Sequence, residues 1–148
     1  MKKRKYRKYI FAVVFLRRKN PQFLILHRIK NWSGWELVKG GLKENENVLR
    51  CLKREVREET GAKEFKILVK THYFIKYRFP KGFVKDNHIY HGAKGYVFLV
   101  ELFSKKIKID RSEHDRSLWV SKDEAMEILT HKNHKNALEY IWKHYKLS

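Results

Sequence analysis

The chain has 148 residues, 43% of them apolar, which is enough for one compact domain with a buried core. Its 35 Lys and Arg outnumber its 16 Asp and Glu, and the net charge of +19 favours polyanionic partners such as phosphate-rich metabolites or nucleic acid. No apolar run approaches the roughly 20 residues that span a bilayer, and the basic N-terminal stretch lacks a signal-peptide cleavage site. With a lone Cys51, no internal disulfide is possible, so we expect an intracellular, cytoplasmic protein.

The first half of the chain predicts strands that lead to a helix. Segments 6–18 and 22–27 are rich in aromatic and β-branched residues and are separated by a turn at Pro21. A short strand is expected over 35–38, ending at a pair of glycines.

The helix is predicted over 47–61. Asn47 can cap its first turn, and Gly61 can supply a left-handed stop. Leu49, Leu52 and Val56 recur at helical spacing, which predicts that this face packs on the core.

The second half of the chain predicts two strands and two helices. Segments 65–79 and 88–103 are expected as strands joined by a loop over 80–87 that contains proline and glycine. Ser121 and Glu124 form a capping-box pattern that opens a helix to about 130, and the last helix is expected near 133–146. The order predicts an α/β domain over 1–148, with a mixed sheet between helices.

Three carboxylates stand together in the first helix. Glu55, Glu58 and Glu59 lie at i, i+3 and i+4, so they share one helix face and repel one another unless a cation neutralises them. Oxygen ligands of this kind suit Mg²⁺ or Mn²⁺. The alternative is a solvated charged face, which is the commoner explanation for an isolated run of charges.

The spacing around these glutamates favours the metal. Residues 40–62 read G-x5-E-x7-R-E-V-R-E-E-T-G-A, with Glu46 as the first fixed carboxylate. This segment resembles the Nudix box of MutT-type hydrolases. The resemblance implies an α/β/α sandwich and a loop–helix–loop that holds divalent metal against a pyrophosphate.

The same resemblance assigns roles to individual residues. Glu55 and Glu59 correspond to the principal metal ligands, and Glu58 corresponds to a residue that assists them. The backbone carbonyl of Lys39, just before the box, is a further ligand in similar proteins. Arg54 corresponds to the residue that orients the glutamates by ion pairing, and Glu46 to one that fixes the loop to the helix.

Two segments outside the box resemble asymmetric diadenosine tetraphosphate hydrolases. Trp35 to Gly41 is similar to their W-x-x-P-K-G entry, although Val38 replaces the proline. Glu113 lies six residues before Trp119, as in their S-x-E-H…W segment. The resemblance implies that Glu113 is a metal ligand or the base that deprotonates water, and its neighbour His114 is the alternative proton acceptor.

Candidate substrate contacts come from aromatic and basic residues outside the box. Tyr73 and Tyr77 lie on one side of a strand, where a tyrosine of the tetraphosphate hydrolases stacks on adenine; ordinary packing on a sheet is the alternative. Trp32 could also cover a base. The candidate phosphate contacts are Lys39, Lys76, Lys94 and Arg28. The histidines show no zinc-binding spacing, and Cys51 is expected to be a buried apolar residue.

The sequence therefore predicts a hydrolase that needs Mg²⁺ or Mn²⁺ and cuts a phosphoanhydride in a nucleoside polyphosphate. A dinucleoside tetraphosphate is the first expectation for the substrate. RNA 5′-pyrophosphohydrolase or decapping-like activity is the alternative, because the net charge favours RNA, and nucleoside triphosphate pyrophosphatase follows. A different class is a non-catalytic RNA- or nucleotide-binding module, but such a module would not need all three box glutamates.

Overall fold

The computed structural model describes residues 2–85 and 87–148, with only the backbone described at 2–5 and at Gly82. The strands are β1 (Lys2–Leu16), β2 (Gln22–Arg28), β3 (Gly34–Glu36), β4 (Val38–Gly41), β5 (Phe65–Lys85), β6 (His88–Leu102) and β7 (His114–Val120). The helices are α1 (Val48–Thr60), α2 (Lys122–Ile128) and α3 (Lys132–His144).

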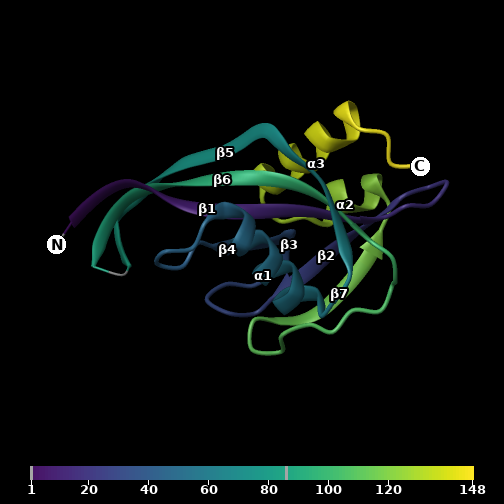
Figure 1. Ribbon diagram of the computed structural model, residues 1–148, viewed down its shortest axis with the longest axis horizontal. Coiled ribbons are helices and arrows are strands. Elements are labelled where there is room, and N and C mark those ends of the chain that lie inside the picture. The colour runs from purple at the N-terminus through teal and green to yellow at the C-terminus, as the bar shows by residue number, and fades with distance from the viewer. Residues whose placement is uncertain (1, 86) are drawn as a thin grey trace.

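The strands form one seven-stranded mixed sheet in the order β3-β2-β1-β6-β5, with β4 added beside β1 and β7 beside β2. β1 and β6 run parallel, whereas the other pairs are antiparallel. In Figure 1, α1 lies on one side of the sheet and α2 and α3 gather on the other.

The core has two halves because side chains alternate along β1. Phe11, Val13 and Phe15 pack in the cluster that includes α2 and α3. The even-numbered residues of the same strand pack in the cluster that includes α1. The predicted α/β/α sandwich is therefore confirmed.

β1 also creates the opening in which the box glutamates lie. Its middle, Tyr9 to Ala12, pairs with β4, whereas its last residues pair with β2. β4 and β2 therefore share one edge of β1, and the loop 42–47 leads from β4 to α1, which packs on β1 and β4.

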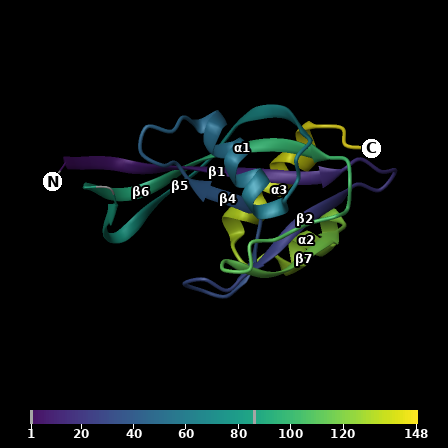
Figure 2. The same cartoon turned by 60° about the horizontal axis from the view of Figure 1, so that its bottom comes forward.

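The far ends of three strands extend beyond the helical layers as a β-sheet arm, defined as residues 2–8, 76–85 and 88–94. Figures 1 and 2 show this arm leaving the body together with the N-terminus. β6 is its central strand and pairs with β1 on one side and β5 on the other.

Some boundaries differ from the prediction. The loop expected over 80–87 is wrong, because β5 continues to Lys85. A register shift between Arg78 and Phe83 takes Pro80 out of the regular ladder, where its missing N–H would otherwise break a hydrogen bond. Leu49 does not face the core: its side chain is 47% exposed, and Cys51 is fully buried instead. In the described part of the chain, no helix has the length and apolar character needed to cross a membrane.

Candidate active site

Helix α1 is fixed at both ends by the residues that the sequence indicated. The Arg50 N–H donates to Asn47 Oδ1 at 2.8 Å, and the Gly61 N–H donates to the Arg57 carbonyl at 2.9 Å with Gly61 at φ 73°. Cys51, Leu52 and Val56 pack this helix on the core, and Glu55 and Glu59 are buried with them.

Arg54 connects the loop before α1 to the carboxylates. Its Nε and Nη2 donate to the two oxygens of Glu46, each at 2.8 Å, and Nη2 also donates to the Gly41 carbonyl at 3.2 Å. Its Nη1 contacts Glu55 and lies 3.3 Å from Glu58. The hydrogen bonds from Arg54 lower the pKa of Glu46 to about 2, so this pair stays charged at neutral pH.

Glycine is required at position 40 because the Glu55 side chain fills the space beside it. A Cβ there would lie 2.2 Å from the Glu55 carboxyl carbon, so any side chain would displace the carboxylate. The first glycine of the box thus makes room for a proposed metal ligand.

Glu55 and Glu59 form a carboxylate pair that needs a positive charge. Burial, followed by the hydrogen bond and charge of Glu55, raises the pKa of Glu59 well above its usual value. Glu59 Oε1 is buried and has no hydrogen-bond partner among the described residues. Such a donor set fits a divalent cation, which would neutralise both groups and use the unpaired oxygen.

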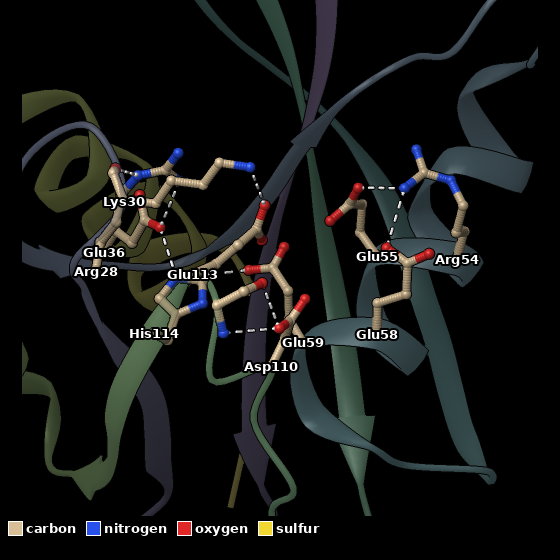
Figure 3. A network of polar contacts seen from close by, with 11 residues as sticks. Arg28, Lys30, Glu36, Arg54, Glu55, Glu58, Glu59, Asp110, Glu113 and His114 are labelled. Atoms are coloured by element: carbon tan, nitrogen blue, oxygen red, sulfur yellow. Dashed lines mark hydrogen bonds and ion pairs between the residues drawn. The ribbon is translucent and has the colours of Figure 1, made fainter.

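A third buried carboxylate, Glu36, lies on the side of Glu59 away from Glu55 (Figure 3). Its Oε2 is 2.8 Å from His114 Nε2 and accepts from Arg28 Nη1 at 3.2 Å, and its Oε1 is 3.8 Å from Lys39 Nζ. Burial alone would raise the pKa of Glu36, but the His114 hydrogen bond and the charges of Lys39 and Arg28 outweigh it, and the pKa is lowered. Glu36 therefore anchors three basic groups at the rim of the site.

His114 joins the two acidic groups. Its Nε2 is 4.0 Å from Glu59 Oε1, and one ligand atom each from Glu36, Glu59 and His114 lies within 4.8 Å of the others. The geometry permits a metal here, but His114 Nε2 and Glu36 already satisfy each other.

Glu113 enters from the loop before β7, opposite α1. Figure 3 shows its carboxylate on the same side as Glu59 and Asp110. The Ile29 N–H donates to the Glu113 carbonyl at 2.9 Å, which ties this loop to the end of β2, and Lys30 Nζ is 3.8 Å from the carboxylate.

Glu55, Arg54 and Glu113 line a cleft of about 820 Å³. Its acidic wall includes Glu55, Glu58, Asp110 and Glu113. The basic residues around it are Arg7, Arg28, Lys30, Lys39, Lys43, Arg54 and Lys85. Carboxylates that can bind metal, surrounded by cations, suit a polyphosphate.

A second cavity of about 500 Å³ shares Lys39 with this cleft. Its lining is aromatic and histidine-rich: Phe11, Trp32, Tyr77, His131 and His134, with Lys132 and Asn133 at the start of α3. A planar, apolar base fits such a lining better than a phosphate does.

The predicted substrate contacts separate into two groups. Tyr77, Arg28 and Lys39 line the two cavities. Tyr73 instead packs on the core, with its ring 5.0 Å from that of Tyr140, which favours the packing alternative.

The remaining two predicted contacts lie over aromatic rings. Lys76 Nζ is 4.6 Å from the Tyr6 ring and Lys94 Nζ is 4.6 Å from the Phe74 ring. Neither lysine is among the described residues that line the two cavities.

The sequence analysis did not identify Glu36 or His134. Glu36 occupies a variable position of the W-x-x-P-K-G pattern, so no motif marks it. Burial lowers the pKa of His134 to about 3, and its neutral Nδ1 accepts the Leu37 N–H at 3.1 Å. The available signal for Glu36 was an acidic residue flanked by the apolar Trp35 and Leu37.

Comparison with known proteins decides the family, since a model of the NUDIX domain matches residues 6–141. The chain belongs to the Nudix family. It is similar to an RNA pyrophosphohydrolase of a Nitratiruptor species, with 30% identity over 97% of both chains. An RNA pyrophosphohydrolase of Helicobacter pylori is 31% identical over 75% of this chain and 72% of its own.

Solved structures agree on the fold. A protein described as a NUDIX hydrolase of Listeria monocytogenes has a TM-score of 0.76 and 25% identity, covering 95% of both chains. A C. elegans Ap4A hydrolase has a TM-score of 0.72 at 16% identity, covering 93% of this chain and 96% of its own. The protein is thus a Nudix hydrolase of pyrophosphate bonds, as predicted.

Proposed function

We propose that this Nudix hydrolase removes pyrophosphate from the 5′ end of triphosphorylated RNA. The supporting observation is the pair of cavities that meet at Lys39: one has carboxylates within a basic ring, and the other is lined by aromatic rings and histidines. A triphosphate in the first and its nucleobase in the second would use both. A relative that matches along 97% of the chain is named an RNA pyrophosphohydrolase, which favours RNA over the dinucleoside tetraphosphate expected first.

Divalent metal would be held by Glu55 and Glu59, with Glu58 assisting, and by the Lys39 carbonyl. When bound, Mg²⁺ or Mn²⁺ neutralises phosphate oxygens and lowers the pKa of a coordinated water. Arg54 keeps Glu55 and Glu58 directed at the cleft.

Side chains of the protein bind the phosphates and accept the proton. Lys39 and Arg28, both held by Glu36, bind and orient phosphate oxygens. Glu113 faces the cleft from the opposite wall and accepts the proton of the attacking water.

The proposal is tested with three substrates under identical conditions with Mg²⁺: a 5′-triphosphorylated oligoribonucleotide, diadenosine tetraphosphate and a nucleoside triphosphate. We expect the highest kcat/KM for RNA, with inorganic pyrophosphate and 5′-monophosphorylated RNA as products. A higher kcat/KM for diadenosine tetraphosphate would reject the proposal in favour of the tetraphosphate hydrolase, which the exposed Tyr77 beside the second cavity could also serve.

The metal assignment is tested by Glu55→Gln and Glu59→Gln. Each should lower turnover by at least about 10²-fold, the usual order for losing one electrostatic group of a catalytic site. Mn²⁺ binding should weaken in parallel while the circular dichroism spectrum stays unchanged. Near-native turnover in either variant would contradict the assignment.

A further inference from the structure

The β-sheet arm is uniformly basic. Residues 2–8, 76–85 and 88–94 contain eleven Lys and Arg and no Asp or Glu, and the hairpin's single Asp, at position 86, lies outside the described residues. An acidic neighbour is Glu44 of the loop before α1, whose carboxylate is 3.9 Å from His88 Nε2. An extended surface of this sign attracts a chain of phosphates.

Aromatic rings form a continuous row along the arm, called here the aromatic track. The track is defined as four aromatic residues and the two basic residues that flank them: Tyr9, Tyr77, Phe79 and Phe83, with Arg7 and Lys85. The Tyr77 and Phe79 rings are 5.9 Å apart and the Phe79 and Phe83 rings 5.7 Å apart. The Arg7 guanidinium lies 4.8 Å from the Tyr9 ring and 5.7 Å from the Phe83 ring. Tyr77 and Phe83 are each 39% exposed, so a planar group can reach them.

The small side chain of Ala93 separates the β1 residue of the track, Arg7, from its β5 residue Tyr77. Ala93 on the central strand pairs with Arg7 on one side and with Tyr77 on the other. Paired residues project to the same side of a sheet, so the side chains of Arg7 and Tyr77 lie on one face with only the small Ala93 side chain between them.

The aromatic track continues from the active site. Arg7, Tyr9, Phe83 and Lys85 line the same cleft as Glu55 and Glu58. Tyr77 lines the second cavity. A polymer whose first residue occupies these cavities therefore meets the track next.

Another part of β5 lies away from the active site. Lys70 and Phe74 pair with Phe98 and Tyr96, which pack with α1 rather than with α3. Lys70 Nζ is 4.7 Å from the Tyr96 ring, and neither Lys70 nor Phe74 is among the described residues lining the two cavities.

We propose that the aromatic track binds single-stranded RNA, namely the nucleotides that follow the triphosphorylated 5′ end; this rests on the proposed function. Bases stack on Tyr77, Phe79 and Phe83, and Arg7 and Lys85 bind phosphates. Stacking on rings accepts any base, so the track gives affinity without sequence preference. It also gives a polymer an advantage over a free nucleotide, which has no following base to stack on Phe79.

Binding of a 5′-hydroxyl decaribonucleotide, measured by fluorescence anisotropy, tests the track independently of catalysis. In the double variant Phe83→Ala/Lys85→Ala, we expect about 20-fold weaker binding near 0.1 M salt, from one lost stacking surface and one lost phosphate contact. The slope of log K against log salt should become shallower by about 0.7. The matched control Phe74→Ala/Lys70→Ala removes the same residue types from a part of β5 that lines neither cavity, and should bind within about twofold of the wild type.

The single variant Lys85→Ala covers the case in which the double variant does not fold. It should show the same change of slope and about fivefold weaker binding. Equal weakening in the control, or weakening in the control alone, would overturn the proposal, because positive charge in general or the Lys70 and Phe74 part of β5 would then explain binding.

A triphosphorylated dinucleotide separates this proposal from the proposed function. If the wild type hydrolyses it and the track variants bind the decamer normally, the track is refuted and the function stands. If the wild type does not hydrolyse it but the track variants lose decamer binding, the function is refuted and the RNA-binding surface stands.

Discussion

Replacing Glu36 by Gln keeps the side-chain shape but removes the negative charge that holds His114, Arg28 and Lys39. Glu36 is fully buried, so water cannot replace the lost charge. At an effective dielectric constant of about 20, its attraction to Arg28 at 3.2 Å and to Lys39 at 3.8 Å amounts to roughly 5 and 4 kcal/mol. The dehydration of these groups offsets part of this, and breaking a buried pair typically costs about 3–5 kcal/mol.

Urea unfolding followed by circular dichroism measures this cost. With a slope of about 2 kcal/mol per molar urea, Glu36→Gln should lower the unfolding midpoint by about 1.5–2.5 M. Glu101→Gln is the matched control, because Glu101 pairs with the partly exposed Arg17 at 3.3 Å, and such a pair contributes about 1 kcal/mol or less. If the two variants lost the same stability, the charge of Glu36 would not organise the site.

Three further predictions concern ionisation at the site and the lone thiol. Because the folded-state pKa of Glu59 is raised, mainly by burial, its contribution to the stability of the metal-free protein is present at acidic pH and is lost as the pH rises through that pKa. In EDTA at pH 7.5, Glu59→Gln should therefore raise the free energy of unfolding, by about 1–3 kcal/mol, and flatten its decline with pH; lower stability than the wild type would contradict this. Glu113→Gln should lower kcat by about 10²–10⁴-fold with Mn²⁺ binding retained. Loss of the basic limb of the pH–rate profile in His114→Ala but not in Glu113→Gln would transfer the proton acceptor to the histidine. Burial raises the pKa of Cys51 to about 12, so iodoacetamide at pH 7.5 should leave activity unchanged, as should Cys51→Ala.

Local rules predicted the box helix well because its determinants are local. Asn47, Gly61 and the glutamate spacing lie within one element, and the caps and the shared face follow from helix geometry alone. The same rules misplaced Leu49, whose exposure depends on what packs against α1 and not on its own periodicity.

Features set by distant contacts were missed. Strand β7 pairs with β2 across about ninety residues of sequence, and its pattern carries little intrinsic strand signal. Glu36 gains its importance from His114, a partner 78 residues away. The continuation of β5 through Pro80 depends on β6 holding both sides of the register shift.

The parallel pairing of β1 with β6 has a consequence for how the chain reaches this structure. During synthesis, β1 can pair with β2 and β4 as soon as about forty residues have emerged, because those partners are adjacent in sequence. Its longest partner, from Lys2↔His88 to Leu16↔Leu102, becomes available only after α1 and β5 have been made. Contacts of such long sequence separation close slowly, since the loop entropy is lost before the strand is gained. The central strand of the finished sheet is therefore half unpaired for most of translation, and its apolar residues, Ile10 to Leu16, need protection from other chains during that interval.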